Sequence, residues 1–291
     1  MARPDAIDRA IARFDREIGL EAVPRVSAAH AEALVRVSGP PEPPAPIESE
    51  RLPAGLAAPA PARAPAPASV HLHPYPAESL AAPADEADRV RRLAALEARH
   101  AESCPHCLAA KGHLNLVFGE GSPTAEVMFV GEAPGETEDR VGRPFVGPAG
   151  EKLDEMIRAM GLRREDTYIA NVLKSRPPGN RTPMPDEVAR CGPFLVEQIL
   201  AVRPKVLVAL GGPAAKWLCG IEGGITRARG IWHEWSPPAG ADCGAIPVMP
   251  TYHPAYVLRT YTPQVRSEVW SDLRAVLARI GREPPQRKPR D

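Results

Sequence analysis

The sequence predicts an α/β protein, a three-layer α/β/α sandwich built on a central parallel sheet and preceded by a disordered extension rich in proline and alanine. Two observations predict the sandwich: short, almost wholly apolar runs alternate with longer segments of helical periodicity, and polar motifs follow several of those runs. A third observation predicts the extension. Of the 36 prolines, 13 lie between Pro40 and Pro83, set among alanines.

The extension has two expected parts. Residues 1–38 carry Ile7, Ile11, Phe14 and Ile18 at helical spacing, which predicts a short amphipathic helix. It either docks on a partner that the sequence does not identify or is a poorly ordered terminus. Residues 39–85 cannot bury enough apolar surface to offset chain entropy, so we expect a disordered linker with polyproline character. The folded domain is expected over 86–283, with a disordered tail at 284–291.

The elements of the domain are predicted in order. Helical spacing of Val90, Leu93 and Leu96 indicates a first helix that starts near Ala84 or Asp85, and Pro185 and Asp186 are start signals for a long one. Continuous apolar runs indicate buried parallel strands. The strands are expected at 126–131, 166–173, 205–211 and 246–254, and the helices at 84–104, 150–161, 185–203, 213–220 and 264–281.

Charge and composition exclude few classes of function. Lysine plus arginine and aspartate plus glutamate each number 36, so a nucleic-acid binder would have to gather its basic residues on one face. The first residues do not resemble a secretory signal, and no apolar run is long enough to span a membrane. We expect a cytoplasmic monomer whose five cysteines stay reduced unless they bind metal or take part in chemistry.

Polar motifs stand at three predicted strand ends: "GEAPGETED", "NVLKSRPPGNR" and "HPAYVLR". Ligands of open parallel sheets bind where loops leave the carboxyl ends of the strands. Together with "GRPFVGPAG" and "PKVLVALG", these motifs resemble the family 4 uracil-DNA glycosylases of iron–sulfur type, in the same order from about Cys104 to Arg274. The resemblance implies a monofunctional hydrolase that cleaves the N-glycosidic bond of uracil in single- or double-stranded DNA, in base excision repair. The alternative is a non-catalytic DNA- or nucleotide-binding module on the same fold.

The resemblance assigns a uracil pocket to Gly131, Ala133, Phe145, Asn171 and His253. Phe145 would stack on the flipped base, although an aromatic in such a loop can also simply anchor it. Asn171 would read the Watson–Crick edge, or else cap a turn. His253 would donate from a neutral imidazole to uracil O2 as negative charge develops there.

Glu132 and Glu138 are the candidate catalytic carboxylates. The wider superfamily has an aspartate where this chain has Ala133, so water activation cannot be credited to that position. We expect Glu138 to stabilise the sugar cation or orient water, and Glu132 to support the loop and pocket.

DNA contacts are expected from loop residues on the same face. Leu258 would fill the vacated base stack, and Arg259 would touch phosphate. Basic neighbours would supply further phosphate contacts. These neighbours are Lys174, Arg176, Arg181, Arg227 and Arg229.

The cysteines depart from the family pattern. The resemblance implies a [4Fe–4S] cluster on four cysteines, of which Cys104, Cys107 and Cys191 are present, while the fourth position is Ser175. Serine oxygen is a poor ligand for cluster iron. A cluster could use Ser175, recruit His106 or His113, take a three-iron form or be absent, and zinc is a further possibility; Cys219 and Cys243 lie far along the chain.

Overall fold

The computed structural model describes residues 75–285. The predicted helix within 1–38 and most of the predicted linker lie outside this range, as does 286–291. The last part of the linker range, however, is folded: helix α2 (Ala77–Leu80) belongs to the domain, because Ser79 hydrogen-bonds Glu197 on α7 (Pro185–Val202) at 2.5 Å. The boundary predicted at residue 86 is therefore about ten residues late.

A six-stranded sheet forms the middle layer, in the order β1-β3-β2-β4-β6-β5. The four predicted strands are its parallel centre, while two short strands that the sequence analysis missed pair antiparallel at the edges. The strands are β1 (Glu120–Gly121), β2 (Val127–Gly131), β3 (Tyr168–Asn171), β4 (Val206–Leu210), β5 (His233–Trp235) and β6 (Ile246–Thr251).

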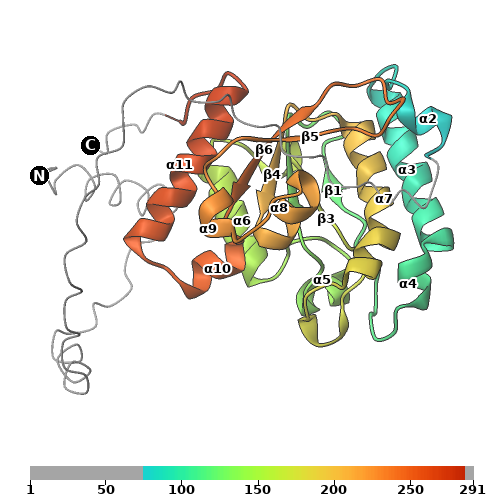
Figure 1. The fold of residues 1–291 in the computed structure, drawn as a ribbon, viewed down its shortest axis with the longest axis horizontal. Coiled ribbons are helices and arrows are strands. Elements are labelled where there is room, and N and C mark those ends of the chain that lie inside the picture. Colours follow the sequence, from blue (N-terminus) through green and yellow to red (C-terminus); the bar gives the residue numbers. More distant parts are fainter. Residues whose placement is uncertain (1–74, 286–291) are drawn as a thin grey trace, which may run out of the picture. The chain divides into compact units, whose positions relative to one another are not determined.

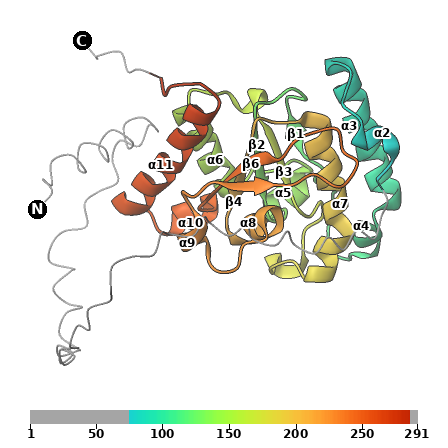
Figure 2. The ribbon, with the colours of Figure 1, turned by 45° about the horizontal axis from the view of Figure 1, so that its top comes forward.

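Helices cover both faces of the sheet, as Figure 1 shows and the turned view of Figure 2 supports. One face packs on α6, α10 and α11, with Phe129, Leu153 and Leu273 in its core. The other packs on α7 and α8, with Met128 and Leu195 in its core. The bounds are α6 (Pro148–Ala159), α8 (Gly212–Cys219), α9 (Ile225–Ala228), α10 (Pro254–Arg259) and α11 (Pro263–Arg279). The predicted α/β/α sandwich is confirmed.

A third, smaller cluster lies outside α7, beneath α3 (Glu86–Ser103) and α4 (Pro105–Ala109). Helix α3 begins as predicted, with Asp85 accepting a hydrogen bond from the Asp88 amide. In this cluster Cys104, Cys107 and Cys191 pack with Phe118 and other apolar side chains. Among residues 75–285 there is no helix with the length and apolarity needed to cross a membrane.

Candidate active site and metal centre

The pocket residues come together at the carboxyl ends of β2 and β3. In these paired strands Gly131 lies opposite Asn171, and both are buried. Adding a Cβ to Gly131 would place it 2.3 Å from Asn171 Oδ1 and 2.6 Å from Phe145 Cζ. Only glycine lets the aromatic ring and the amide approach this closely, since real Cβ contacts do not fall under 3 Å.

Phe145 occupies a strained backbone position. Its φ is 50°, in the left-handed region that non-glycine residues rarely adopt. The backbone oxygen of Phe145 lies 2.0 Å from where a Cβ of Gly150 would stand, so the turn also requires that glycine. The ring is 5% exposed and lies 5.7 Å from the His253 ring, centroid to centroid. Strain of this kind is typical of functional sites.

Asn171 has a buried acceptor without a partner. The side chain is 1% exposed, and Oδ1 has no hydrogen-bond partner in the described part of the chain. A buried unpaired polar atom costs about 1–3 kcal/mol, so its retention suits a ligand that donates to it.

His253 is held as a neutral donor. It is the N-cap of α10, and its Nδ1 accepts a hydrogen bond from the Ala255 amide at 3.1 Å. Burial lowers the pKa of His253 to about 4, with a smaller effect in the same direction from Arg259. Because Nδ1 accepts, the proton of the neutral ring must sit on Nε2, which leaves Nε2–H free to donate.

The two carboxylates differ in their surroundings. Glu138, on α5 (Glu136–Val141), accepts hydrogen bonds on Oε1 from the amides of Val146 and Gly147, both at 2.9 Å. Glu138 therefore supports the loop that carries Phe145, from a helix where the sequence analysis expected only a loop, and the supporting role of Glu132 stays a prediction. Glu132 is partly buried, and burial raises the pKa of its carboxyl group.

Some of the residues predicted to contact DNA are exposed, and others lie close to carboxylates of the same chain. Leu258 and Arg259 are exposed at the end of α10, as a wedge and a phosphate ligand require. Arg176, 21% exposed, lies 3.5 Å from Glu136 and 3.9 Å from Asp139. Of the two further arginines, Arg181 pairs with Glu187 at 2.6 Å, and Arg227 is exposed.

The structure contradicts the phosphate contacts predicted for Lys174 and Arg229, because both side chains are held inside the fold. Lys174 is fully buried, and its Nζ donates to the backbone oxygen of Asn171 at 2.8 Å and to Gln198 Oε1 at 2.5 Å. Burial lowers its pKa to about 8. It cannot reach phosphate. Arg229 forms an ion pair with the buried Asp272 and also donates to the backbone oxygen of Glu268 at 2.7 Å, so its guanidinium is committed inside the fold.

The metal-binding group contains a residue that the sequence analysis missed. His100, Cys104, Cys107 and Cys191 are all buried, and their donor atoms lie within 4.8 Å of one another. Hydrogen bonds from Cys107 and Cys191 lower the pKa of the Cys104 thiol, whereas burial raises the pKa of Cys191. The available signal was the spacing His-x3-Cys-x2-Cys, which places His100 one helical turn before Cys104.

The other proposed donors lie elsewhere. Ser175 Oγ lies 3.2 Å from Nε2 of His106, and Ser175 also hydrogen-bonds the Cys107 thiol. Neither His106 nor His113 belongs to the group of four, and Cys219 and Cys243 pack against the core on the α7 and α8 side. The donors present are therefore three thiols and one imidazole, which do not fit the four-thiolate set of the family's [4Fe–4S] cluster.

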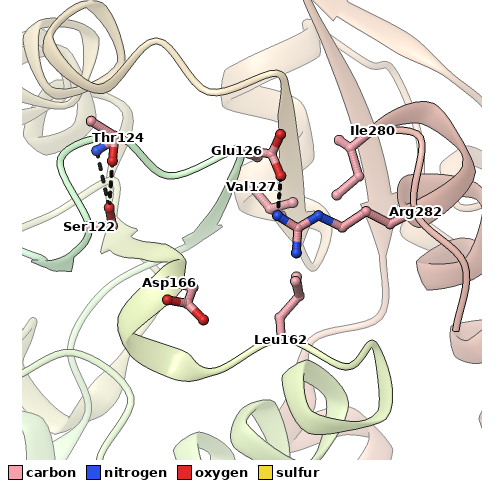
Figure 3. Close-up of a pocket in the computed structure, with 8 residues that line it drawn as sticks. All are labelled: Ser122, Thr124, Glu126, Val127, Leu162, Asp166, Ile280 and Arg282. Carbon is pink, nitrogen blue, oxygen red and sulfur yellow. Dashed lines mark hydrogen bonds and ion pairs between the residues drawn. The ribbon is translucent and has the colours of Figure 1, made fainter. Parts of the chain in front are cut away.

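A hollow at the opposite end of β2 is separate from this site. Its volume is about 290 Å³, and Glu126 and Val127 line it at the start of the strand, whereas Gly131 lies at the strand's end. Figure 3 shows the ion pair between Arg282 and Glu126, which both line this hollow. Its position at the amino end of the strand excludes it as part of the candidate active site.

Comparison with known proteins agrees with the resemblance. The family model for the uracil DNA glycosylase superfamily matches residues 118–274. A type-4 uracil-DNA glycosylase of Thermotoga maritima is 44% identical over 183 residues, 62% of this chain and 92% of that protein. One from Archaeoglobus fulgidus is 44% identical over 194 residues, 64% of this chain and 93% of that protein. A type-5 uracil-DNA glycosylase of Pyrobaculum aerophilum is 33% identical over 150 residues, 46% and 63% of the two chains.

Proposed function

The chain belongs to the uracil-DNA glycosylase superfamily, and on that premise we propose that it hydrolyses the N-glycosidic bond between uracil and deoxyribose in DNA. The observation that carries this proposal is the buried Oδ1 of Asn171, which has no hydrogen-bond partner among residues 75–285, together with Phe145 and a neutral His253. A flat base with a donor on one edge and an acceptor that gains negative charge matches these three groups.

Base recognition follows from the amide. Oδ1 of Asn171 accepts from uracil N3–H, and its amide nitrogen donates to O4, a pairing that cytosine cannot reproduce because its N3 accepts and its N4 donates. The base must leave the DNA stack to reach them. Phe145 stacks on the flipped base, while Leu258, exposed at the end of α10, fills the space that the base leaves.

Bond cleavage requires stabilisation of two opposite charges. As the bond breaks, negative charge grows on uracil O2, where Nε2–H of His253 donates. Positive charge grows on the sugar, where the carboxylates act. Glu138 holds the loop of Phe145 through Oε1 and lowers the energy of the cation, and Glu132 receives a proton from the attacking water. The products are free uracil and an abasic site.

The metal site has a structural role in this proposal. The resemblance implies a [4Fe–4S] cluster, whose four-thiolate set the donors present do not fit, and a metal at this position would be held by Cys104, Cys107, Cys191 and His100. When bound, a metal group at this position joins α3, α4 and α7 and supplies no step of the hydrolysis.

The test is release of free uracil from a single-stranded oligonucleotide containing one deoxyuridine. Wild-type protein should release uracil, His253→Ala should lose most of the rate, and His233→Ala, on the edge strand β5, should not. Folded wild-type protein that binds the oligonucleotide but releases no uracil would contradict the proposal and favour the alternative of a non-catalytic DNA-binding module.

A further inference from the structure

We propose that a single tetrahedral zinc ion, held by Cys104, Cys107, Cys191 and His100, stands in this chain where its family has a four-cysteine iron–sulfur cluster. The proposal concerns the metal chemistry of the chain and does not depend on the reaction proposed above. It rests on the identity, spacing and burial of the four donors.

The distances among His100, Cys107 and Cys191 match one ion, and all four donor atoms lie within 4.8 Å of one another. Zn–S bonds of about 2.3 Å and Zn–N bonds of about 2.0 Å in a tetrahedron place two sulfurs about 3.8 Å apart and a sulfur and a nitrogen about 3.5 Å apart. Here Cys107 Sγ and Cys191 Sγ are 3.8 Å apart, and His100 Nε2 lies 3.3 Å from the first and 3.9 Å from the second. An iron–sulfur cubane needs wider spacing, since each of its donors binds a different iron.

At this separation the sulfur atoms are not bonded as a disulfide. A disulfide requires sulfurs about 2.05 Å apart, and all three cysteines are free. Three thiols and an imidazole are also one of the common donor sets of structural zinc sites. Gathering them in an apolar cluster, with Cys104 and Cys191 wholly buried, suits a cation that neutralises the thiolates.

His100 is positioned for ligation by its surroundings. The ring is 1% exposed and meets Phe194 edge-on, with centroids 4.8 Å apart and an interplanar angle of 87°. Phe118 lies against it with a centroid distance of 5.9 Å. These two aromatic rings fix the imidazole so that Nε2 faces the sulfurs of Cys107 and Cys191.

Ser175 is a neighbour of the site and not a ligand. Its hydroxyl lies 3.2 Å from His106 Nε2 and hydrogen-bonds the Cys107 thiol. Groups of this kind orient a ligand from outside the coordination shell. The thiolate that the family has at position 175, in the loop after β3, is thus replaced by an imidazole from helix α3.

The first experiment measures metal and acid-labile sulfide in full-length protein produced with both zinc and iron supplied. We expect one zinc per chain, no labile sulfide and a colourless protein. Iron with stoichiometric sulfide and brown colour would overturn the proposal. Replacement of zinc by cobalt(II) should give the intense visible bands of tetrahedral cobalt with thiolate ligands; an octahedral spectrum would also overturn it.

Variants then test the fourth ligand. His100→Ala should lose at least tenfold in zinc affinity, while the matched control Ser175→Ala should keep one zinc per chain. Unchanged affinity in the first, or loss of zinc in the second, would contradict the assignment. Should His100→Ala fail to fold, His100→Cys decides: it should keep zinc, and its cobalt form should gain thiolate-to-cobalt charge-transfer absorption. A cobalt spectrum identical to wild type would exclude His100 as a ligand.

Discussion

The protonation of His253 sets an acid limit on both stability and the proposed reaction. Burial and the Arg259 guanidinium lower the pKa of this imidazole from 6.5 to about 4, while Glu138 acts in the opposite direction. In the unfolded chain the ring regains its ordinary pKa. Between pH 6.5 and 4, therefore, the unfolded state binds a proton that the folded state does not, and stability falls as the pH falls through that window.

The size of the effect follows from the two pKa values. At pH 4.5, with about 1.4 kcal/mol per pKa unit, His253 lowers the free energy of unfolding by about 2.5 kcal/mol relative to pH 8. His253→Asn isolates this contribution, because asparagine can accept the Ala255 amide at the N-cap but does not titrate. Urea unfolding of both proteins at the two pH values should show wild type losing about 2.5 kcal/mol more than the variant.

The pH dependence of uracil release should also reflect the ionisation of His253. Single-turnover uracil release should not show a His253 ionisation between pH 5.5 and 8, and nitrogen NMR should find the proton on Nε2 throughout that range. Arg259→Ala should raise the pKa of His253 in the free protein. An imidazole that titrates near pH 6.5, or one protonated on Nδ1 at pH 7, would refute the assignment of His253 as a neutral Nε2 donor.

Further predictions concern the pocket and its supports. Asn171→Ala should slow uracil release about tenfold to a hundredfold while the protein still folds, because each lost hydrogen bond is worth about 1 kcal/mol; unchanged kinetics would remove Asn171 from base reading. Gly131→Ala should slow release by a comparable factor because its Cβ overlaps the amide, which a crystal structure of the variant would show. Glu138→Gln should keep the loop hydrogen bonds and most of the melting temperature but lose rate, whereas equal losses in Glu138→Gln and Glu138→Ala would show that charge is the whole role. Lys174→Met should lower stability by about 2 kcal/mol without changing the salt dependence of DNA binding, while Arg259→Ala should reduce that salt slope by about 0.7–0.9.

The sequence was sufficient to predict the centre of the sheet, because strands buried on both faces must be apolar along their whole length. All residues of β2, β3 and β4 are buried, which is why these strands could be recognised in the sequence as continuous apolar runs. The edge strands β1 and β5 span two and three residues and carry no such pattern. Helix α5 was missed for a similar reason, since six residues rich in acidic groups after a glycine resemble a loop.

Single-residue geometry decided where each of the predicted site residues lies in the fold. Phe145, Asn171 and His253 sit at strand ends and in a glycine-rich loop, where position along the chain almost determines position in space. Lys174 follows the same strand by three residues, yet its side chain turns inward to the Asn171 carbonyl, and no pattern of charge in the sequence distinguishes that from an exposed lysine. His100 escaped notice because one of its partners, Cys191 on α7, lies 91 residues further along the chain.

Lys174 connects the metal site to the base pocket. Its Nζ binds the backbone oxygen of Asn171, and the sulfurs of Cys191, Cys107 and Cys104 lie close enough to favour its positive charge. A buried ammonium in an apolar region needs both its hydrogen-bond acceptors and a nearby negative charge. In the proposed zinc site, three thiolates on one divalent ion would carry a net charge of −1 for this purpose. Loss of the metal would let the thiolates take up protons, which would remove the charge that holds Lys174 in place, and the disturbance would reach Asn171, the proposed base-reading residue.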